Sequence, residues 1–236
     1  MPETLPDFFY SFDSAEVLAD KLAEKVAGRL DAAITLKGKA SLVVSGGSTP
    51  LPLFTKLSRQ HVDWQRVFIT LADERWVDTS DSSSNEHAVR VHLLQNKAAQ
   101  AKFIGLKNTS LTAVSGELET HAALEAMPRP FDMVILGMGD DGHTASLFPS
   151  AERLPEAVDM QSEKSCIAIT PPEVPFERMS MTLRTLLDTN EIILHITGEK
   201  KRATLAMALD KDDPNNMPIR YIIHQEITPV SIYWAP

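Results

Sequence analysis

The sequence predicts an α/β protein built on an open, mostly parallel β-sheet with helices on both faces. Short apolar runs typical of buried strands alternate with amphipathic runs typical of helices, and the links between them are short. The chain has 236 residues, 43% of them hydrophobic and 23% charged, which suits one domain with a sizeable core. These features predict a single domain over residues 1–236 with a Rossmann-like three-layer arrangement.

The first helix is predicted from Ser14 to about Leu36, because apolar residues recur there at spacings of three and four and Gly38 follows as a stop signal. Other elements follow from apolar runs and turn residues. Strands are predicted at 40–44, 67–71, near 103–104, and at 133–136, 164–169, 178–181 (an edge strand), 191–196 and 230–234. Helices are predicted at 51–57 (capped by Thr49), 86–96 (capped by Ser84 or Asn85), 111–127, 182–188 and 203–209, with 153–160 as a loop and 171–175 as a rigid connector.

Composition narrows the possible partners. The net charge of −9 argues against binding to nucleic acid or to an anionic membrane, since both require a basic surface. Cys166 is the single cysteine, so an intramolecular disulfide and a cysteine-rich zinc site are excluded. The first residues do not resemble a signal peptide, and no window is long and apolar enough to span a bilayer. We therefore expect a soluble, cytoplasmic protein.

A strand, a Gly-Gly turn and a helix start follow one another at residues 40–57. The turn carries Gly46 and Gly47 with the hydroxyls of Ser48 and Thr49, and Pro50 begins the helix. Free backbone N–H groups at such a turn favour a phosphate or carboxylate. A tight turn without a ligand is the alternative, and no Walker A lysine follows.

Residues 131–149, FDMVILGMGDDGHTASLFP, form the most informative stretch. A buried strand ends at Gly137 and is followed by Asp140, Asp141 and His143. The carboxyl edge of a parallel sheet is where ligands bind, so acids and a histidine at this point suggest an active site. Asp141 can hold the imidazole in one tautomer and stabilise it when it takes up a proton. A hydrogen-bonded turn histidine remains the alternative.

Two other interpretations of this stretch are disfavoured. Residues 137–142 match the dinucleotide pattern G-x-G-x-x-G, but Asp140 and Asp141 would repel a pyrophosphate there. A zinc site lacks a second histidine at a suitable spacing, and His195 fits a sheet residue better than a ligand.

Positively charged residues also follow two of the predicted strands. Arg75 lies just past the strand at 67–71, where a solvated loop is an equal alternative to a site. Residues 200–202, Lys-Lys-Arg, open a helix, where cations oppose the helix dipole. An anionic ligand would explain at least one of these three, although a solvated charge run is the usual explanation.

Four motifs together resemble a known family. SGGSTP at 45–50, DERWV at 73–77, GDDGHTASLFP at 139–149 and TGEKK at 197–201 look like the 6-phosphogluconolactonase family of the glucosamine-6-phosphate isomerase/deaminase superfamily, over nearly the whole chain. The deaminase branch has a tyrosine where this chain has Arg75, and it continues differently after Gly-His. Both departures favour the lactonase branch.

The resemblance implies roles for individual residues. His143 would be the general base that deprotonates water, and Asp141 would orient it; Asp140 is the less favoured acid. Contacts to the substrate and its 6-phosphate are implied for Gly46, Gly47, Ser48, Thr49, Arg75, Arg178 and Lys201. Lys200 and Arg202 are less favoured than Lys201.

The implied activity is hydrolysis of 6-phospho-D-glucono-1,5-lactone to 6-phosphogluconate, the second step of the oxidative branch of the pentose phosphate pathway. No cofactor and no metal are implied. We expect the lactone as a small-molecule partner, no nucleic acid, no membrane, and a monomer or small homo-oligomer. Two alternatives stay open: a non-catalytic sugar-phosphate binding protein, and an enzyme of the glucosamine-6-phosphate isomerase/deaminase type.

Overall fold

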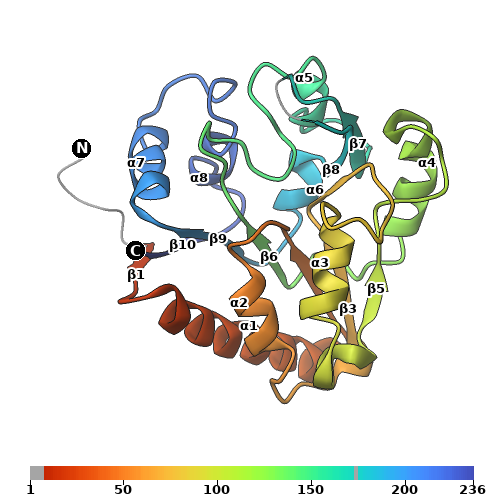
Figure 1. The fold of residues 1–236 in the computed structure, drawn as a ribbon, viewed down its shortest axis with the longest axis vertical. Coiled ribbons are helices and arrows are strands. Elements are labelled where there is room, and N and C mark those ends of the chain that lie inside the picture. Colours follow the sequence, from red (N-terminus) through yellow and green to blue (C-terminus); the bar gives the residue numbers. More distant parts are fainter. Residues whose placement is uncertain (1–7, 173–174) are drawn as a thin grey trace.

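A seven-stranded β-sheet runs through the centre of the computed structural model, which describes residues 8–172 and 175–236 (Figure 1). All neighbouring strands in this sheet are parallel, so the predicted parallel α/β sheet is confirmed. In spatial order the strands are β1 (Phe9–Ser11), β10 (Val230–Ala235), β9 (Ile192–Thr197), β6 (Met133–Leu136), β2 (Ala40–Val44), β3 (Val67–Leu71) and β5 (Lys102–Ile104).

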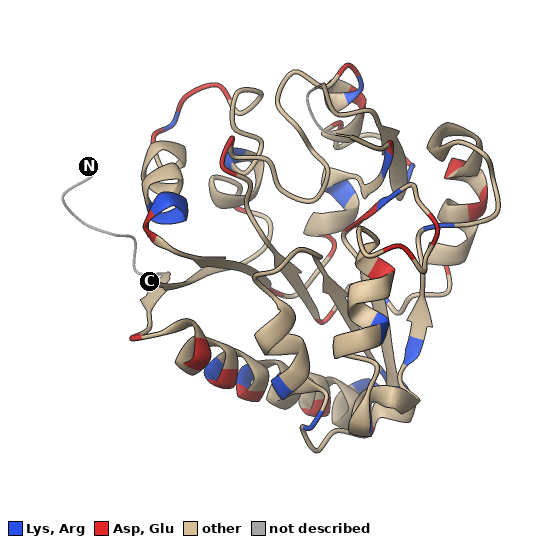
Figure 2. Cartoon of the chain, in the orientation of Figure 1, with Lys and Arg blue, Asp and Glu red and all other residues tan. Residues whose placement is uncertain are grey.

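Helices cover both faces of this sheet, as Figure 1 shows, with α1 and α2 on one side and α7 and α8 on the other. The central strands β2 and β6 are fully buried because they are covered on both faces, which explains their continuous apolar sequence. Figure 2 shows charged residues along α1 and none on β2, β6 or β9. The helices are α1 (Ala15–Lys37), α2 (Leu51–Leu57), α3 (Asn85–His92), α4 (Ala113–Leu124), α5 (Leu154–Ala157), α6 (Leu183–Leu187), α7 (Glu199–Ala208) and α8 (Arg220–Ile223), with 3₁₀ helices η1 (Trp64–Arg66) and η2 (Asn96–Gln100).

The ends of α1 follow the sequence signals. The Ser14 hydroxyl accepts a hydrogen bond from the Val17 amide at 3.2 Å, and Gly38 ends the helix in the left-handed conformation with φ of 76°. Ser84 caps α3 in the same way as Ser14 caps α1, through the His87 amide.

A second, antiparallel sheet stands beside the first and corrects two sequence predictions. Its strands are β4 (Asp73–Arg75), β8 (Arg178–Met181) and β7 (Cys166–Ile169), in that order. Residues 178–181 therefore form the middle strand and not an edge strand. Residues 73–75, expected in a loop, leave β3 after Ala72 and pair with β8, because a strand partner satisfies backbone groups that are buried here.

Glu74 fixes the direction in which β4 leaves the main sheet. Its buried carboxylate accepts hydrogen bonds from the amides of Arg75, Asn85 and Glu86, each at 2.7 Å, and from the Ser84 hydroxyl at 3.0 Å. Burial raises the pKa of this carboxyl, while the hydrogen bonds oppose that rise. The bonds tie β4 to the start of α3 and so hold the residues on either side of Glu74 in place.

Several shorter elements differ from the predictions. Thr49 does not cap α2, because Pro50 occupies the N-cap position and no side chain bonds there. The predicted loop at 153–160 contains α5, whose Leu154 and Ala157 are buried. The helix predicted to Met127 ends at Leu124. Strand β1 and helix α8 were missed, since three or four residues are too short to show a period.

Two further predictions fall partly outside the described residues. Glu173 and Val174 of the expected connector at 171–175 lie there, as do residues 1–7 of the stretch judged unlike a signal peptide. Within residues 8–172 and 175–236, no helix has the length and apolar character needed to cross a membrane.

Candidate active site

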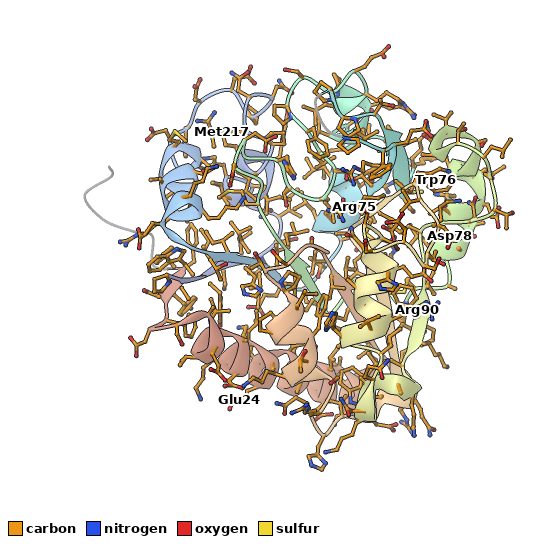
Figure 3. All side chains as sticks on the ribbon, viewed as in Figure 1. Glu24, Arg75, Trp76, Asp78, Arg90 and Met217 are labelled. Atoms are coloured by element: carbon orange, nitrogen blue, oxygen red, sulfur yellow. The ribbon has the colours of Figure 1, made fainter. Side chains whose placement is uncertain are left out.

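A cavity of about 870 Å³ opens at the carboxyl edge of the parallel sheet. The loops that follow β2, β6 and β9, three adjacent strands, all line it, as expected for loops at the carboxyl edge of a parallel sheet. Strands β4 and β8 of the second sheet add another wall through Asp73, Arg75 and Arg178. In Figure 3, Arg75 lies towards the middle of the molecule, whereas Trp76 and Asp78 lie towards α4.

Asp141 and His143 form a close pair in the loop after β6. Nδ1 of His143 lies 2.6 Å from Oδ1 of Asp141, and the same oxygen accepts the His143 amide at 3.1 Å. Burial raises the pKa of Asp141, but the bonds from His143 lower it more, and the net pKa lies below its usual value. An ionised Asp141 accepts a proton-bearing Nδ1, which leaves Nε2 of His143 as the basic nitrogen. The imidazole also packs on Phe148, with ring centroids 4.2 Å apart.

Gly139 allows this pair to form. A Cβ at residue 139 would lie 2.1 Å from Nδ1 of His143 and 2.5 Å from Oδ1 of Asp141. The Gly139 amide also donates to the His143 carbonyl at 2.8 Å, which closes the turn. The second glycine of the G-x-G pattern, Gly139, therefore makes room for His143 and Asp141.

Asp140 points to different partners from its neighbour Asp141. Its carboxylate lies 2.5 Å from Nζ of Lys200 and 2.6 Å from Nζ of Lys201. Hydrogen bonds from these two lysines lower the pKa of Asp140 to about 2. Lys201 lines the cavity, whereas the Lys200 side chain is 77% exposed and Arg202 lies over the Trp234 ring. The structure therefore brings only Lys201 of the three cations to the cavity wall.

The Gly-Gly turn after β2 forms another part of the wall. Gly46, Gly47, Ser48 and Thr49 all line the cavity. A Cβ at Gly46 would lie 1.9 Å from the Asn85 side chain, and Gly47 has a φ of 92°, so both positions require glycine. At these two positions the turn presents backbone rather than a side chain to a ligand.

Arg75 and Arg178 lie directly opposite each other on β4 and β8. Nη1 of Arg75 donates to the Ser83 carbonyl at 2.6 Å. Arg178 is buried, and its Nε and Nη1 atoms have no hydrogen-bond partner among the described residues. Burial and the charge of Arg75 lower the pKa of Arg178, against the pull of Asp73 and Glu74. Like charges placed opposite each other are destabilising, and an anion in the cavity would satisfy both.

The structure also adds residues that sequence reasoning did not select. Asp73 is buried, and its carboxylate accepts a bond of 2.6 Å from the Ser146 hydroxyl. Asn85 donates to the backbone carbonyl of Asp73 at 2.8 Å. Asp73 lies in the DERWV motif, so this motif could have identified it as a site residue. Its contact with Ser146 joins residues far apart in sequence, so the sequence gives no signal for that contact. Within the described part of the chain, no cluster of three or more His, Cys, Asp or Glu side chains could hold a metal ion.

Comparison with known proteins agrees with this geometry. The family model described as glucosamine-6-phosphate isomerases/6-phosphogluconolactonase matches residues 13–234. The chain belongs to this family. It is 43% identical to a 6-phosphogluconolactonase of Pseudomonas putida, over 94% of this chain and 90% of that one, and 40% identical to one of Rhizobium meliloti, over 95% and 97%. A crystal structure of a 6-phosphogluconolactonase from Shewanella baltica OS155 covers 98% of both chains with a TM-score of 0.96 and 46% identity.

The contact of Gly139 with the pair gives a prediction for this family member. Gly139→Ala should break the bond between Asp141 and His143, because the new Cβ collides with both side chains. The ¹⁵N chemical shifts of the His143 ring should then change from one dominant tautomer to a mixture. Gly137→Ala is the matched control, since a Cβ there meets nothing within 4 Å. An unchanged tautomer in Gly139→Ala would contradict this account of the turn.

Proposed function

We propose that this chain hydrolyses 6-phospho-D-glucono-1,5-lactone to 6-phosphogluconate, the second step of the oxidative branch of the pentose phosphate pathway. Membership of the family and full-length similarity to proteins named 6-phosphogluconolactonase support the activity. The observation that carries the proposal is the Asp141–His143 pair, which lies in a cavity that also gathers cations and backbone N–H donors. Hydrolysis of a phosphorylated lactone requires a general base near the lactone carbonyl and an anion-binding site near the phosphate.

His143 acts as the general base in this mechanism. Its Nε2 takes a proton from a water molecule, and the oxygen of that water attacks the C1 carbonyl of the lactone. When the tetrahedral intermediate collapses, the bond between C1 and the ring oxygen breaks and the imidazolium returns the proton to that oxygen. The products are a carboxylic acid at C1, which ionises, and a free hydroxyl at C5. Asp141 holds the ring and stabilises its charged form.

The 6-phosphate occupies the other side of the cavity. Gly46, Gly47, Ser48 and Thr49 supply N–H and hydroxyl donors, and Lys201 supplies a charge. Asp140 holds Lys201 in place and is ionised at neutral pH, so the phosphate joins an existing ion pair.

Arg75 and Arg178 act at the sugar-acid end, where negative charge develops on the C1 oxygen. The Ser146 amide donates to the Ser180 hydroxyl at 3.2 Å, which ties β8 to the loop that carries His143. Arg178 on the same strand therefore lies on the His143 side of the site. Two guanidinium groups there would stabilise an oxyanion.

The proposal extends to residues 1–236 as one 6-phosphogluconolactonase-like domain. The family match reaches residue 234, and β1 from one end of the chain pairs with β10 from the other. We also propose a cytoplasmic location, because the substrate is an intermediate of central carbohydrate metabolism, and a monomer or small homo-oligomer as the working form.

His143→Ala tests the proposed function. We expect kcat for freshly generated 6-phosphogluconolactone to fall by about 10² or more, since a general base contributes that much, while the thermal unfolding midpoint stays near wild type. The rate of spontaneous ring opening is subtracted, and glucosamine 6-phosphate serves as the control substrate that wild type should leave unchanged. A wild-type rate in His143→Ala would remove His143 as the base. Ligand-induced stabilisation of wild type without turnover would favour a binding protein instead.

Lys201→Ala tests the phosphate site. We expect KM for the lactone to rise about tenfold or more with a smaller change in kcat, because a remote phosphate contact binds ground state and transition state alike. Lys200→Ala is the matched control: Lys200 pairs with the same carboxylate but is exposed, so its loss should change KM less than threefold or so. Equal effects of the two substitutions would show that Lys201 has no special place in the site.

A further inference from the structure

His195 is the polar exception in strand β9, which is otherwise aliphatic up to its last residue. The side chain is only 3% exposed, yet it lines the cavity. Its Nδ1 atom is buried and has no hydrogen-bond partner among the described residues. Buried polar groups are normally bonded, so an unpartnered nitrogen in the wall of a cavity requires an explanation.

The other unpartnered atoms point to the same explanation. Buried side-chain atoms without a partner, in the described part of the chain, belong to Ser45, Asn85, Arg178, His195 and Arg220. All of these residues except Arg220 line the one cavity. Unsatisfied groups scattered by chance would not gather in this way. A polar ligand in the cavity would satisfy groups that the protein itself leaves unpaired.

The chemistry of His195 restricts what it can bind. Burial lowers the pKa of its imidazole to about 4, and no charged neighbour contributes to that shift. The ring is therefore neutral at the pH of the cell, with one donor and one acceptor nitrogen. A hydroxyl group, which also both donates and accepts, matches a neutral imidazole, whereas a phosphate is better served by Lys201.

Its place along the sheet edge sets which part of a substrate it would meet. The register of β6 and β9 pairs Leu136 with Leu194, so Gly137 and His195 are the next neighbours. The Gly137 carbonyl accepts the hydroxyl of Thr144, the residue after His143, at 2.8 Å. On the other side, β9 leads through Gly198 into the helix turn that carries Lys201. His195 thus lies on the strand that leads to Lys201, next to the strand whose loop carries His143.

We infer that His195 binds a ring hydroxyl of the substrate between its C1 and C6 ends and selects for polyhydroxylated sugar lactones. The inference rests on the proposed function, because that function places C1 at His143 and C6 at Lys201. Gly137 supports this role, since the absence of a side chain beside His195 leaves room for a sugar ring.

The test compares wild type, His195→Leu and His195→Gln on 6-phosphogluconolactone and on its 2-, 3- and 4-deoxy forms. We expect kcat/KM of His195→Leu to fall about tenfold or more on the full substrate. The kcat/KM of wild type should fall by a similar factor on the one deoxy lactone that lacks the bound hydroxyl. On that lactone, wild type and His195→Leu should have the same kcat/KM. His195→Gln, which keeps a donor and an acceptor, should recover part of the loss. The thermal unfolding midpoint of His195→Leu should stay level or rise, because an unpartnered buried polar atom is removed.

Other outcomes separate this inference from the proposed function. A His195→Leu rate within twofold of wild type, or an equal loss on every lactone, would overturn the role of His195. If His195→Leu does not fold, the deoxy series on wild type decides, since equal rates on all forms would also overturn it. If wild type does not accelerate ring opening at all, the proposed function fails instead. Calorimetric binding of 6-phosphogluconate to wild type and His195→Leu then still tests the contact, and equal affinities would overturn it.

Discussion

The hydrogen bond between Asp141 and His143 is the interaction on which the site depends. It forms only because the chain leaves β6 through glycines, and a side chain at residue 139 would occupy the space of both partners. The strand before the turn is fully buried in a parallel sheet, so the turn has a rigid base. Neighbouring strands then deliver the other groups to the same edge. A glycine-containing loop on a rigid sheet thus places His143 in the wall of the cavity.

Three cations and three acids meet at this cavity. In a chain of net charge −9, Lys201, Arg75 and Arg178 line it together with Asp73, Asp140 and Asp141. Asp140 balances Lys201, while Arg178 is left with buried N–H groups that have no partner among the described residues. A buried cation without a partner destabilises the folded protein. The lactone carries a doubly charged phosphate and gains a carboxylate on hydrolysis, so its negative charge would offset that cost. The arrangement thus suits a substrate whose negative charge increases during the reaction.

Sequence alone predicts the parts of this fold that depend on local pattern. The strand at 40–44 has its predicted bounds because it is apolar on both faces, and Asp141 and His143 are two residues apart. The second sheet could not be predicted in the same way, since its pairing of Asp73 with Ser180 joins distant segments. Burial is likewise invisible in the sequence: Arg178 looked like an edge residue, and His195 looked like an ordinary sheet residue. Only the structure shows that both side chains line the cavity and have buried polar atoms without a partner among the described residues.

The central claim is that Asp141 and His143 act as one unit. A double-mutant cycle with Asp141→Asn, His143→Ala and the double variant tests it most directly, with kcat for 6-phosphogluconolactone corrected for spontaneous opening. Groups that act together are strongly non-additive. We predict that Asp141→Asn lowers kcat about tenfold or more in wild type and has almost no effect once His143 is alanine. Equal losses from Asp141→Asn in both backgrounds would contradict the claim, because Asp141 would then act independently of the imidazole.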